Sequence, residues 1–311
     1  MRNILISSVS KKVPLIQAVR EASKRFNPDC SIIGADLDPN CIGQYFVDSF
    51  WQMPAIDELK VEDLIRYCKK ENIRFIIPTR DGELSFYAEH RDTLKKEGID
   101  VMVSSKHSVD LALDKFSFFQ ELEGVIPTFL TCQELKAFPC VVKARYGAGS
   151  AAVRCNLNRE DALAYGDRSR DLVFQPYIKG QEYSADLYVT RKGAVHGVVC
   201  RERNVITHGE SQISITVRDE EITSKCHSCA AKMNLYGHVM FQFIREASTG
   251  KLFVLECNPR FGGASTTSIK AGLDSFFWFF TEAEGRPLPR FDRLSHEVKL
   301  VRSARDMFID L

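Results

Sequence analysis

The sequence has no excess of either charge sign and no long apolar run. Its 311 residues include 42 Lys and Arg against 41 Asp and Glu, which gives a net charge of +1. This balance gives no reason to expect a nucleic-acid partner. No stretch approaches the roughly 20 apolar residues of a membrane span, and the apolar run in "MRNILISSVS" is too short for a signal-peptide core. We therefore expect a cytoplasmic protein with no membrane and no nucleic-acid partner.

A disulfide framework is also missing. The ten cysteines have no regular spacing, and several lie in apolar, strand-like runs such as "FPCVVKA", so we expect reduced thiols. Cys226 and Cys229 in "KCHSCAAKM" have the spacing of a zinc or redox motif. A structural zinc needs about four ligands, and no second pair matches this one. The pair lies within a helical pattern at about residues 219–235, and we expect two ordinary helix cysteines.

Strand and helix patterns alternate over the first hundred residues. The strands are "NILISSV", "SIIGADLD", "FIIPT" and "DVMVSS", and helical stretches separate them, the first of which is "VPLIQAVREASKRF". Such alternation predicts a parallel sheet with helices on both faces, which is a Rossmann-like domain over residues 1–105. Asp36 and Asp38 are placed to hold a ribose, but the first turn, "SSVSKKVP", has no glycine to approach a pyrophosphate. We expect no dinucleotide site in this domain.

The segment "IPTRDGEL" has two interpretations. Ligands of open parallel sheets collect at the carboxyl ends of the strands, where Thr79, Asp81 and Glu83 would face a substrate. The same residues are suited to cap the helix that begins near Glu83. The sequence leaves both alternatives open.

The pattern changes from residue 106 onward. "SVDLALDKFSFFQELE" predicts one helix, and the strands and helix that follow predict a small α+β lobe over residues 106–180. Long strands, a helix and the hairpin "GHVMFQFIREASTGKLFVLECNPR" predict a larger lobe over residues 181–311. The fold class is therefore α/β and α+β, in two or three domains.

The strand "VLECNPRFGG" has one polar face. Side chains alternate along a strand, so Glu256 and Asn258 point together, while Leu255 and Cys257 point to the other side. Gln242 lies on the partner strand of the hairpin. A carboxylate and two amide oxygens suit magnesium, which typically bridges nucleotide phosphates.

Two further segments suit a nucleotide. In "VVKARYGAGSAAV", Lys143 ends an apolar strand before a glycine loop that can cover phosphates, although a simple glycine hairpin is the alternative. It is not a Walker A loop, because the lysine precedes the glycines. In "LVFQPYIKGQE", apolar side chains can flank a base at a hinge, and Glu182 can accept bonds from a ribose. Taken alone, the second segment is a strand, a turn and a strand.

The order of these segments resembles the ATP-grasp superfamily, and within it the synthetase components of the carbamoyl-phosphate synthase large subunit. The stretches that carry the resemblance are "LDKFSFF", "FPCVVKARYGAGSAAV", "LVFQPYIKGQEYSADLYV", "HGESQISITV", "MFQF" and "VLECNPRFGG". They span residues 108 to about 290, and the first hundred residues are similar to the pre-ATP-grasp domain. The resemblance implies an N-terminal Rossmann-like pre-ATP-grasp domain followed by a two-lobed ATP-grasp domain.

The resemblance also implies the site and its cofactors, ATP and Mg²⁺, with Mn²⁺ as a substitute. Metal ligands would be Gln242, Glu256 and Asn258. Catalytic residues would be Lys143, Arg201 and Arg260, of which Arg260 holds the acceptor carboxylate or the transferred phosphoryl group. Nucleotide-binding residues would be Lys115, Lys143, Gly147, Ala148, Gly149, Ser150, Gln175, Pro176, Tyr177, Ile178 and Glu182. Arg203 and His208 are further candidates for phosphate or acceptor contacts.

The implied function is that of an ATP-dependent carboxylate–amine or carboxylate–nucleophile ligase. It would form an acyl phosphate, release ADP and phosphate, and take small-molecule substrates. Phosphoryl transfer requires positioning and charge neutralisation, which fits a set of lysines, arginines and metal ligands. A carbamoyl-phosphate synthase large subunit has two such synthetase halves besides other regions, and this chain resembles one of the two halves. A component using bicarbonate and ammonia and a non-catalytic ATP-binding partner subunit are the alternatives, and a homodimer is the default assembly.

Overall fold

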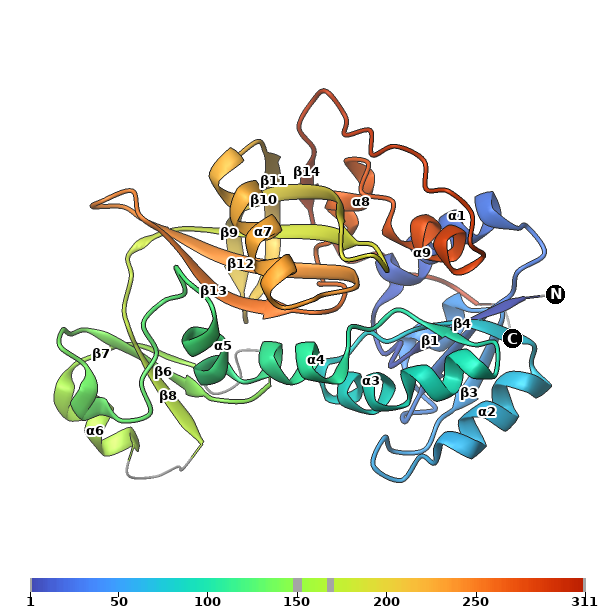
Figure 1. The fold of residues 1–311 in the computed structure, drawn as a ribbon, viewed down its shortest axis with the longest axis horizontal. Coiled ribbons are helices and arrows are strands. Elements are labelled where there is room, and N and C mark those ends of the chain that lie inside the picture. The colour runs from blue at the N-terminus through green and yellow to red at the C-terminus, as the bar shows by residue number, and fades with distance from the viewer. Residues whose placement is uncertain (1, 148–152, 167–170, 310–311) are drawn as a thin grey trace.

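The computed structural model describes residues 2–147, 153–166 and 171–309. Within these ranges the strands form sheets of five, six and three strands. Figure 1 shows the five-stranded sheet at the right, the six-stranded sheet in the upper centre and the three-stranded sheet at the lower left. The expected α/β and α+β class is confirmed.

The N-terminal sheet is parallel, with the strand order β3-β2-β1-β4-β5 of a doubly wound fold. The central strand β1 supplies Ile4, Leu5 and Ile6, all fully buried, because helices cover both faces of the sheet. The elements of this unit are β1 (Asn3–Ser7), α1 (Val13–Phe26), β2 (Ile32–Asp36), η1 (Ile42–Phe46), β3 (Ser49–Gln52), α2 (Val61–Lys70), β4 (Ile73–Ile77), α3 (Asp81–Lys96) and β5 (Asp100–Val101).

Two short helices follow where the sequence predicts one. Asp114 separates α4 (Lys106–Leu113) from α5 (Lys115–Glu121), as the C-cap of the first helix and the N-cap of the second. The Asp114 carboxylate accepts hydrogen bonds from the backbone N–H of Phe116 at 3.0 Å and from Arg145 Nε and Nη2 at 2.8 and 2.6 Å. The single-helix prediction is wrong because Asp114 caps a new helix and binds Arg145, which directly follows β6 (Cys140–Ala144) of the next unit.

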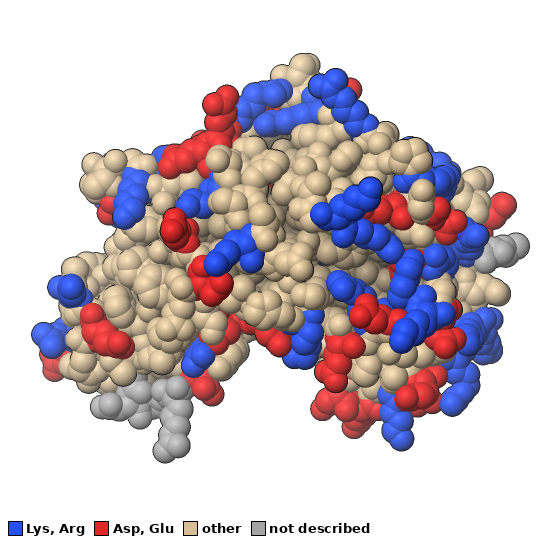
Figure 2. Space-filling view, in the orientation of Figure 1, with Lys and Arg blue, Asp and Glu red and all other residues tan. Residues whose placement is uncertain are grey.

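The small lobe contains the antiparallel sheet β7-β6-β8. A compact core that includes Cys140, Val142 and Phe174 joins this sheet to a helix. The elements are η2 (Cys132–Glu134), β6 (Cys140–Ala144), β7 (Arg154–Leu157), α6 (Arg159–Gly166) and β8 (Leu172–Pro176). In Figure 2 the outline of the molecule is indented between this lobe and the N-terminal unit.

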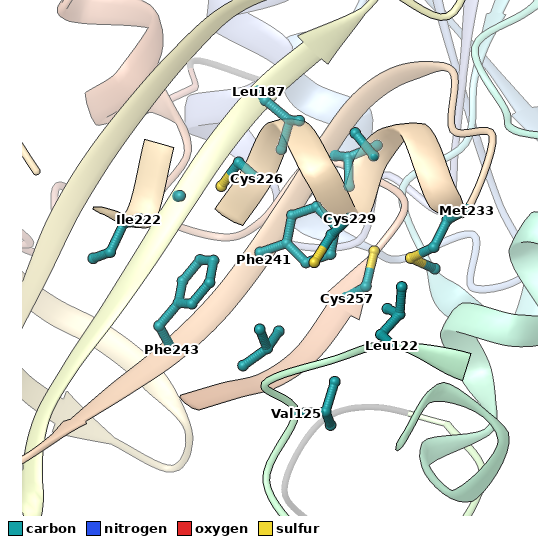
Figure 3. Close-up of a cluster of buried hydrophobic side chains, with 14 of the residues drawn as sticks. Leu122, Val125, Leu187, Ile222, Cys226, Cys229, Met233, Phe241, Phe243 and Cys257 are labelled. Carbon is teal, nitrogen blue, oxygen red and sulfur yellow. The ribbon is translucent and has the colours of Figure 1, made fainter. Parts of the chain in front are cut away.

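The six-stranded sheet has the order β13-β12-β9-β10-β11-β14. One face packs against a helix and encloses a core that holds Cys226, Cys229 and Cys257 (Figure 3). The elements are β9 (Gly180–Val189), β10 (Val195–Thr207), β11 (Glu210–Val217), α7 (Glu220–Lys232), β12 (Gly237–Glu246), β13 (Leu252–Asn258), α8 (Thr266–Lys270), α9 (Ser275–Ala283) and β14 (Lys299–Val301).

The C-terminal helix α9 packs on the N-terminal sheet. Phe279 and Phe280 lie with ring centroids 5.9 and 4.9 Å from that of Phe75 in β4, and Phe280 also contacts Phe26 of α1. A single hydrophobic cluster therefore joins the two ends of the chain. The domain boundaries at residues 105 and 180 stay predictions.

The cysteines lie as the sequence predicts. All ten are free, and Cys226 and Cys229 are buried core residues of α7. Burial raises the pKa of both thiols, which makes them unreactive. The described residues contain no group of three or more His, Cys, Asp or Glu arranged to hold a metal. In the same residues, no helix has the length and apolar character needed to cross a membrane.

Candidate active site

The polar face of the "VLECNPR" strand continues across the large sheet. Glu256 of β13 pairs with Gln242 of β12, Gln242 pairs with Ser184 of β9, and Ser184 pairs with Arg201 of β10. Directly paired residues of antiparallel strands project to the same face. A carboxylate, an amide, a hydroxyl and a guanidinium therefore form one row across the sheet, on the face opposite the core.

A bulge in the β12–β13 hairpin corrects the predicted position of Leu255. Glu256 pairs with Gln242, but the next pair is Val254 with Phe243, so Leu255 has no partner of its own. The extra residue shifts the side-chain alternation by one. Leu255 therefore lines the same cleft as Glu256 while it also packs against the edge of the core, whereas Val254 and Cys257 are fully part of that core.

This face forms one wall of a cleft of about 490 Å³. The small lobe supplies the opposite wall, and the segment from Gln175 to Glu182 connects the two. Every described residue that the resemblance assigns to the nucleotide, metal or catalytic site lines this cleft: Lys115, Lys143, Gly147, Gln175, Pro176, Tyr177, Ile178, Glu182, Arg201, Gln242, Glu256, Asn258 and Arg260. The predicted loop residues Ala148, Gly149 and Ser150 lie outside the described residues.

Two buried lysines face the carboxylate of Glu256. Lys115 and Lys143 are only 8% and 9% exposed. Burial lowers the pKa of both ammonium groups, and the charge of Glu256 partly offsets this effect. Lys115 Nζ donates to the carbonyl oxygen of Gly147 at 2.6 Å, which ties the start of α5 to the base of the glycine loop. The lysines thus bring positive charge to the small-lobe side of the cleft.

The three predicted metal ligands lie together. Burial alone would raise the pKa of Glu256, but the Lys143 ammonium and a 3.1 Å hydrogen bond from Asn258 Nδ2 hold it below its usual value. Glu256 is therefore ionised, and Gln242 Oε1 lies on the strand directly opposite. One carboxylate and two amides are too few ligands to fill the coordination shell of Mg²⁺, but they suit an ion whose other ligands are phosphate oxygens.

Arg203 organises the part of the cleft near the predicted ribose ligand. Its Nη1 donates to Glu182 at 2.6 Å and to Gln242 Oε1 at 2.9 Å, while Nη2 donates to the carbonyl of Gly209 at 2.6 Å. The sequence suggests a phosphate or acceptor contact for Arg203. In this structure its nitrogens instead orient the predicted ribose and metal ligands and hold the β10–β11 hairpin.

At the predicted hinge, the Gln175 side chain and a backbone N–H group both form hydrogen bonds within the protein. Gln175 is 2% exposed, and its Nε2 donates to Thr128 Oγ1 at 2.8 Å. The backbone N–H of Tyr177 donates to the carbonyl of Pro139 at 3.0 Å. The hinge is thus a fixed, largely apolar edge of the cleft.

The structure separates the residues of "IPTRDGEL". Glu83 accepts the backbone N–H groups of Thr79 and Arg80 at 2.6 and 2.9 Å, so these residues form the start of α3. Asp81 instead forms an ion pair with Arg260. Asp81 of the N-terminal unit therefore reaches the cleft, where its carboxylate fixes the guanidinium of Arg260 after β13.

The sequence prediction missed the residues at the far end of the cleft. Arg302, just after β14, donates to Glu210 at 2.7 Å, and both line the cleft beside Gly262 and Gly263. A Cβ at Gly262 would lie 2.6 Å from Met240 Sδ, so a larger residue at this turn would require the Met240 side chain to move. Only the "FGG" after the polar strand could have signalled this close approach.

Two family descriptions match the chain. "PylC-like, N-terminal domain" covers residues 4–102, and "ATP-grasp in the biosynthetic pathway with Ter operon" covers residues 168–304. Curated relatives include the carbamoyl phosphate synthase large chain of Sulfolobus acidocaldarius, 21% identical over 66% of this chain and 22% of that protein. The protein of the same name from Pseudomonas putida is 22% identical over 70% of this chain and 23% of its own length. The chain thus spans under a quarter of these relatives.

Solved structures share the fold over nearly the whole chain. The biotin carboxylase domain of 2-oxoglutarate carboxylase from Hydrogenobacter thermophilus, in complex with MgADP, ADP and bicarbonate, has a TM-score of 0.77 at 16% identity, covering 96% of this chain and 73% of that chain. N5-carboxyaminoimidazole synthetase from Staphylococcus aureus, in complex with ADP, has a TM-score of 0.73 at 16% identity over 93% of this chain and 79% of its own. These matches establish the fold. The two family matches and the curated relatives confirm the resemblance to ATP-grasp proteins that the sequence motifs indicate.

Proposed function

We propose that this protein is an ATP-dependent ligase that activates a carboxylate as an acyl phosphate. ADP leaves in the first step, and an amine or another nucleophile then displaces phosphate from the acyl group. The observation that carries the proposal is the cleft itself, where Lys115 and Lys143 of one wall face Glu256 and Gln242 of the other. This is an arrangement for neutralising phosphate charge, and phosphoryl transfer depends on it.

Each wall has a separate task in this proposal. The hinge from Gln175 to Ile178 holds the adenine, and Glu182, oriented by Arg203, accepts the ribose hydroxyls. Lys115 and Lys143 bind the phosphates. Bound with the nucleotide, Mg²⁺ would add positive charge between phosphate oxygens, held by Gln242, Glu256 and Asn258.

The acceptor would lie beyond the phosphates. Arg260, fixed by Asp81, holds its carboxylate so that an oxygen faces the γ-phosphorus. The work of the chain is therefore to align two anions that repel each other in solution.

The test is magnesium-dependent ADP release across a panel of carboxylic acids and amines. The panel includes bicarbonate with ammonia, because carbamoyl phosphate synthase large chains are among the relatives. We expect turnover with one pair, and turnover with bicarbonate and ammonia alone would favour the carbamoyl-phosphate-type alternative.

Two variants make the test specific to the site. Glu256→Gln should abolish ADP release, whereas Glu246→Gln, at the partly exposed end of β12 in the same hairpin, should leave it unchanged. Nucleotide binding without turnover on any pair would contradict the ligase proposal and support a binding-only role. Wild-type turnover in Glu256→Gln would remove the metal assignment.

A further inference from the structure

A second cavity, of about 290 Å³, lies where the N-terminal unit meets the large lobe. Helix α3 contributes Arg91 and Lys95 to its wall, and the turn between β9 and β10 contributes Arg191. Tyr236 comes from the connection between α7 and β12. The volume is close to the lower end of the range for ligand pockets, about 300–1,000 Å³. Segments far apart in the sequence thus enclose a space for a small molecule.

This cavity is separate from the cleft of the candidate active site. The two share no lining residue within the described ranges. Asp81, which reaches the cleft, is in the first turn of α3, whereas Lys95 is in its last turn. At about 1.5 Å per residue, the helix rises by about 21 Å between them. The cleft and the cavity therefore lie at opposite ends of α3.

The inner wall of the cavity has more positive than negative charge. Its buried acid is Asp100 of β5, which is 2% exposed. Three cations surround this carboxylate: Arg74 Nη1 lies 2.5 Å from Oδ2, Lys95 Nζ lies 2.6 Å from Oδ1, and Arg191 Nη2 also contacts Oδ1. One cation is enough to neutralise one carboxylate. Asp100 therefore leaves positive charge around it that it cannot balance.

A count of the lining residues gives the same sign. Three cations, Arg91, Lys95 and Arg191, line the cavity, against Asp92 and Asp100 among the described residues. Asp92 lies 3.7 Å from Arg91 Nε, but its side chain is 88% exposed, so solvent screens it. The surplus is one positive charge when Asp92 is counted and two at the inner wall.

The three cations are held in place and keep donors for a ligand. Lys95 has three N–H donors and Arg191 has five, of which each gives one to Asp100. The backbone N–H of Arg191 donates to Glu282 Oε1 at 2.9 Å, which fixes the β9–β10 turn. Arg91 Nη1 donates to the carbonyl of Val103 at 3.3 Å. Lys95 follows Arg91 by four residues, so both project from one face of α3.

Tyr236 adds a hydroxyl that lacks an acceptor. Its backbone N–H donates to Ser104 Oγ at 3.0 Å, which fixes the residue before β12. Its phenol oxygen is buried and has no hydrogen-bond partner in the part of the chain that the structure describes. Arg191 Cζ lies 5.7 Å from the ring centroid, but a guanidinium has no acceptor for the phenol proton. Buried donors are normally satisfied, and a ligand oxygen is an acceptor of the kind that this hydroxyl lacks.

We propose that this cavity is a second ligand site, which binds a phosphate group through Lys95 and Arg191, with Arg91 at its rim. A phosphate monoester carries about −1.5 to −2 charges at pH 7, which matches the surplus at the inner wall, whereas a carboxylate carries only one. Its oxygens accept charge-assisted hydrogen bonds from lysine and arginine. The ligand is inorganic phosphate or the phosphate of a small molecule, and the test separates these sources.

The site joins two parts of the chain. Lys95 belongs to the N-terminal unit, and Arg191 belongs to the large lobe. A phosphate bound between them would tie the two units together at the end of α3 that is far from the cleft. The proposal does not depend on the ligase function, because none of these residues lines the cleft.

The test measures how small anions shift the thermal unfolding of the full chain. The probes are inorganic phosphate, glycerol 1-phosphate and acetate, each titrated against chloride at equal ionic strength. A ligand that binds only the folded state raises Tm by an amount that grows with its concentration relative to its Kd. We expect both phosphate probes to raise the Tm of the wild type, and acetate to raise it much less.

Lys95→Met is the main variant. It keeps the apolar stem of the side chain, and Arg74 and Arg191 still neutralise Asp100, so the chain should fold. Loss of one charged donor should weaken the binding of the phosphate probes about 10-fold. Arg91→Met leaves the contacts of Asp100 intact and gives a second measurement. It should weaken binding about threefold, because a partly exposed charge is screened by solvent.

Two further variants are controls. Lys96→Met removes the same charge from the next residue, which is exposed and lines neither cavity, and it should leave probe binding unchanged. Lys143→Met removes a lysine of the cleft and should leave the phosphate response that depends on Lys95 in place.

The outcomes are distinct. Tighter binding of glycerol 1-phosphate than of inorganic phosphate would identify a phosphorylated small molecule as the ligand, and the reverse order would identify free phosphate. A wild type that responds to neither phosphate probe would overturn the site, and so would equal affinity in the wild type and Lys95→Met. A response lost in Lys143→Met but kept in Lys95→Met would place the phosphate in the cleft instead. Acetate binding more tightly than either phosphate probe would overturn the assignment to a phosphate group.

Discussion

Glu256 should affect the binding of ADP in opposite directions with and without magnesium. Its carboxylate repels the phosphates of metal-free ADP, and it lies in the same row as Gln242 and opposite two buried lysines. Glu256→Gln keeps the size of the side chain but removes the charge. Metal-free ADP should therefore bind the variant more tightly, while MgADP should bind it more weakly.

The magnitude follows from the charge that is removed. A unit charge about 6 Å from a phosphate contributes about 3 kcal/mol at an effective dielectric constant of about 20. Solvent in an open cleft reduces this to about 1 kcal/mol, or about fivefold tighter binding of metal-free ADP. Loss of a charged ligand costs about 1.5–3 kcal/mol, or about 10- to 100-fold in the affinity for MgADP.

Isothermal titration with ADP in EDTA and in excess Mg²⁺ measures both effects. We expect the ratio of the Kd for MgADP to the Kd for metal-free ADP to rise by about two orders of magnitude in Glu256→Gln. The same ratio should stay constant in Glu246→Gln. An unchanged ratio in Glu256→Gln, with the variant folded, would refute the assignment of Glu256 to the metal.

Three further predictions concern the supports of the site. Asp81→Asn should lower the rate of ADP release about 10- to 100-fold, because Arg260 loses its partly buried, charged partner. The Kd for MgADP should change less than about twofold, and a large change in that Kd would contradict this prediction. Burial lowers the pKa of Lys12 from 10.5 to about 8. The unfolded chain then holds a proton that the folded chain lacks between these pH values, so stability should rise by up to about 3 kcal/mol across that window. Urea unfolding of the wild type and of Lys12→Met, repeated across this pH range, checks the prediction. If the free energy of unfolding depends on pH in the same way in both proteins, the prediction is contradicted. Asp114→Ala should lower the free energy of unfolding in urea by about 2 kcal/mol, because it removes the cap of α5 and the ion pair to the small lobe. The control, Asp110→Ala, removes only an exposed ion pair and should lower it by less than about 0.5 kcal/mol. Equal losses in the two variants would argue against the cap.

Local signals explain which parts of the fold could be predicted. The helix "VPLIQAVREASKRF" occupies the predicted residues as α1, because a proline in the first turn and an apolar stripe mark it clearly. β3 was missed, since "SFWQ" is a four-residue edge strand with no fully buried residue. The break at Asp114 was missed because its partner, Arg145, lies 31 residues away in the sequence.

The site shows the same division between local and distant signals. The Glu256 and Asn258 pair follows from strand periodicity alone, and Gln242 from the hairpin. The bulge at Leu255 does not, because it depends on the register with the partner strand. Nor could the sequence show that Arg203 binds Glu182 or that Asp81 binds Arg260, since these pairs join segments 21 and 179 residues apart.

A crystal structure with MgADP would locate the nucleotide. We expect adenine at the hinge beside Ile178, phosphates between Lys115 and Lys143, and the metal against Glu256. A nucleotide bound outside this cleft, or one bound in it with the phosphates directed away from the two lysines, would refute the proposed site.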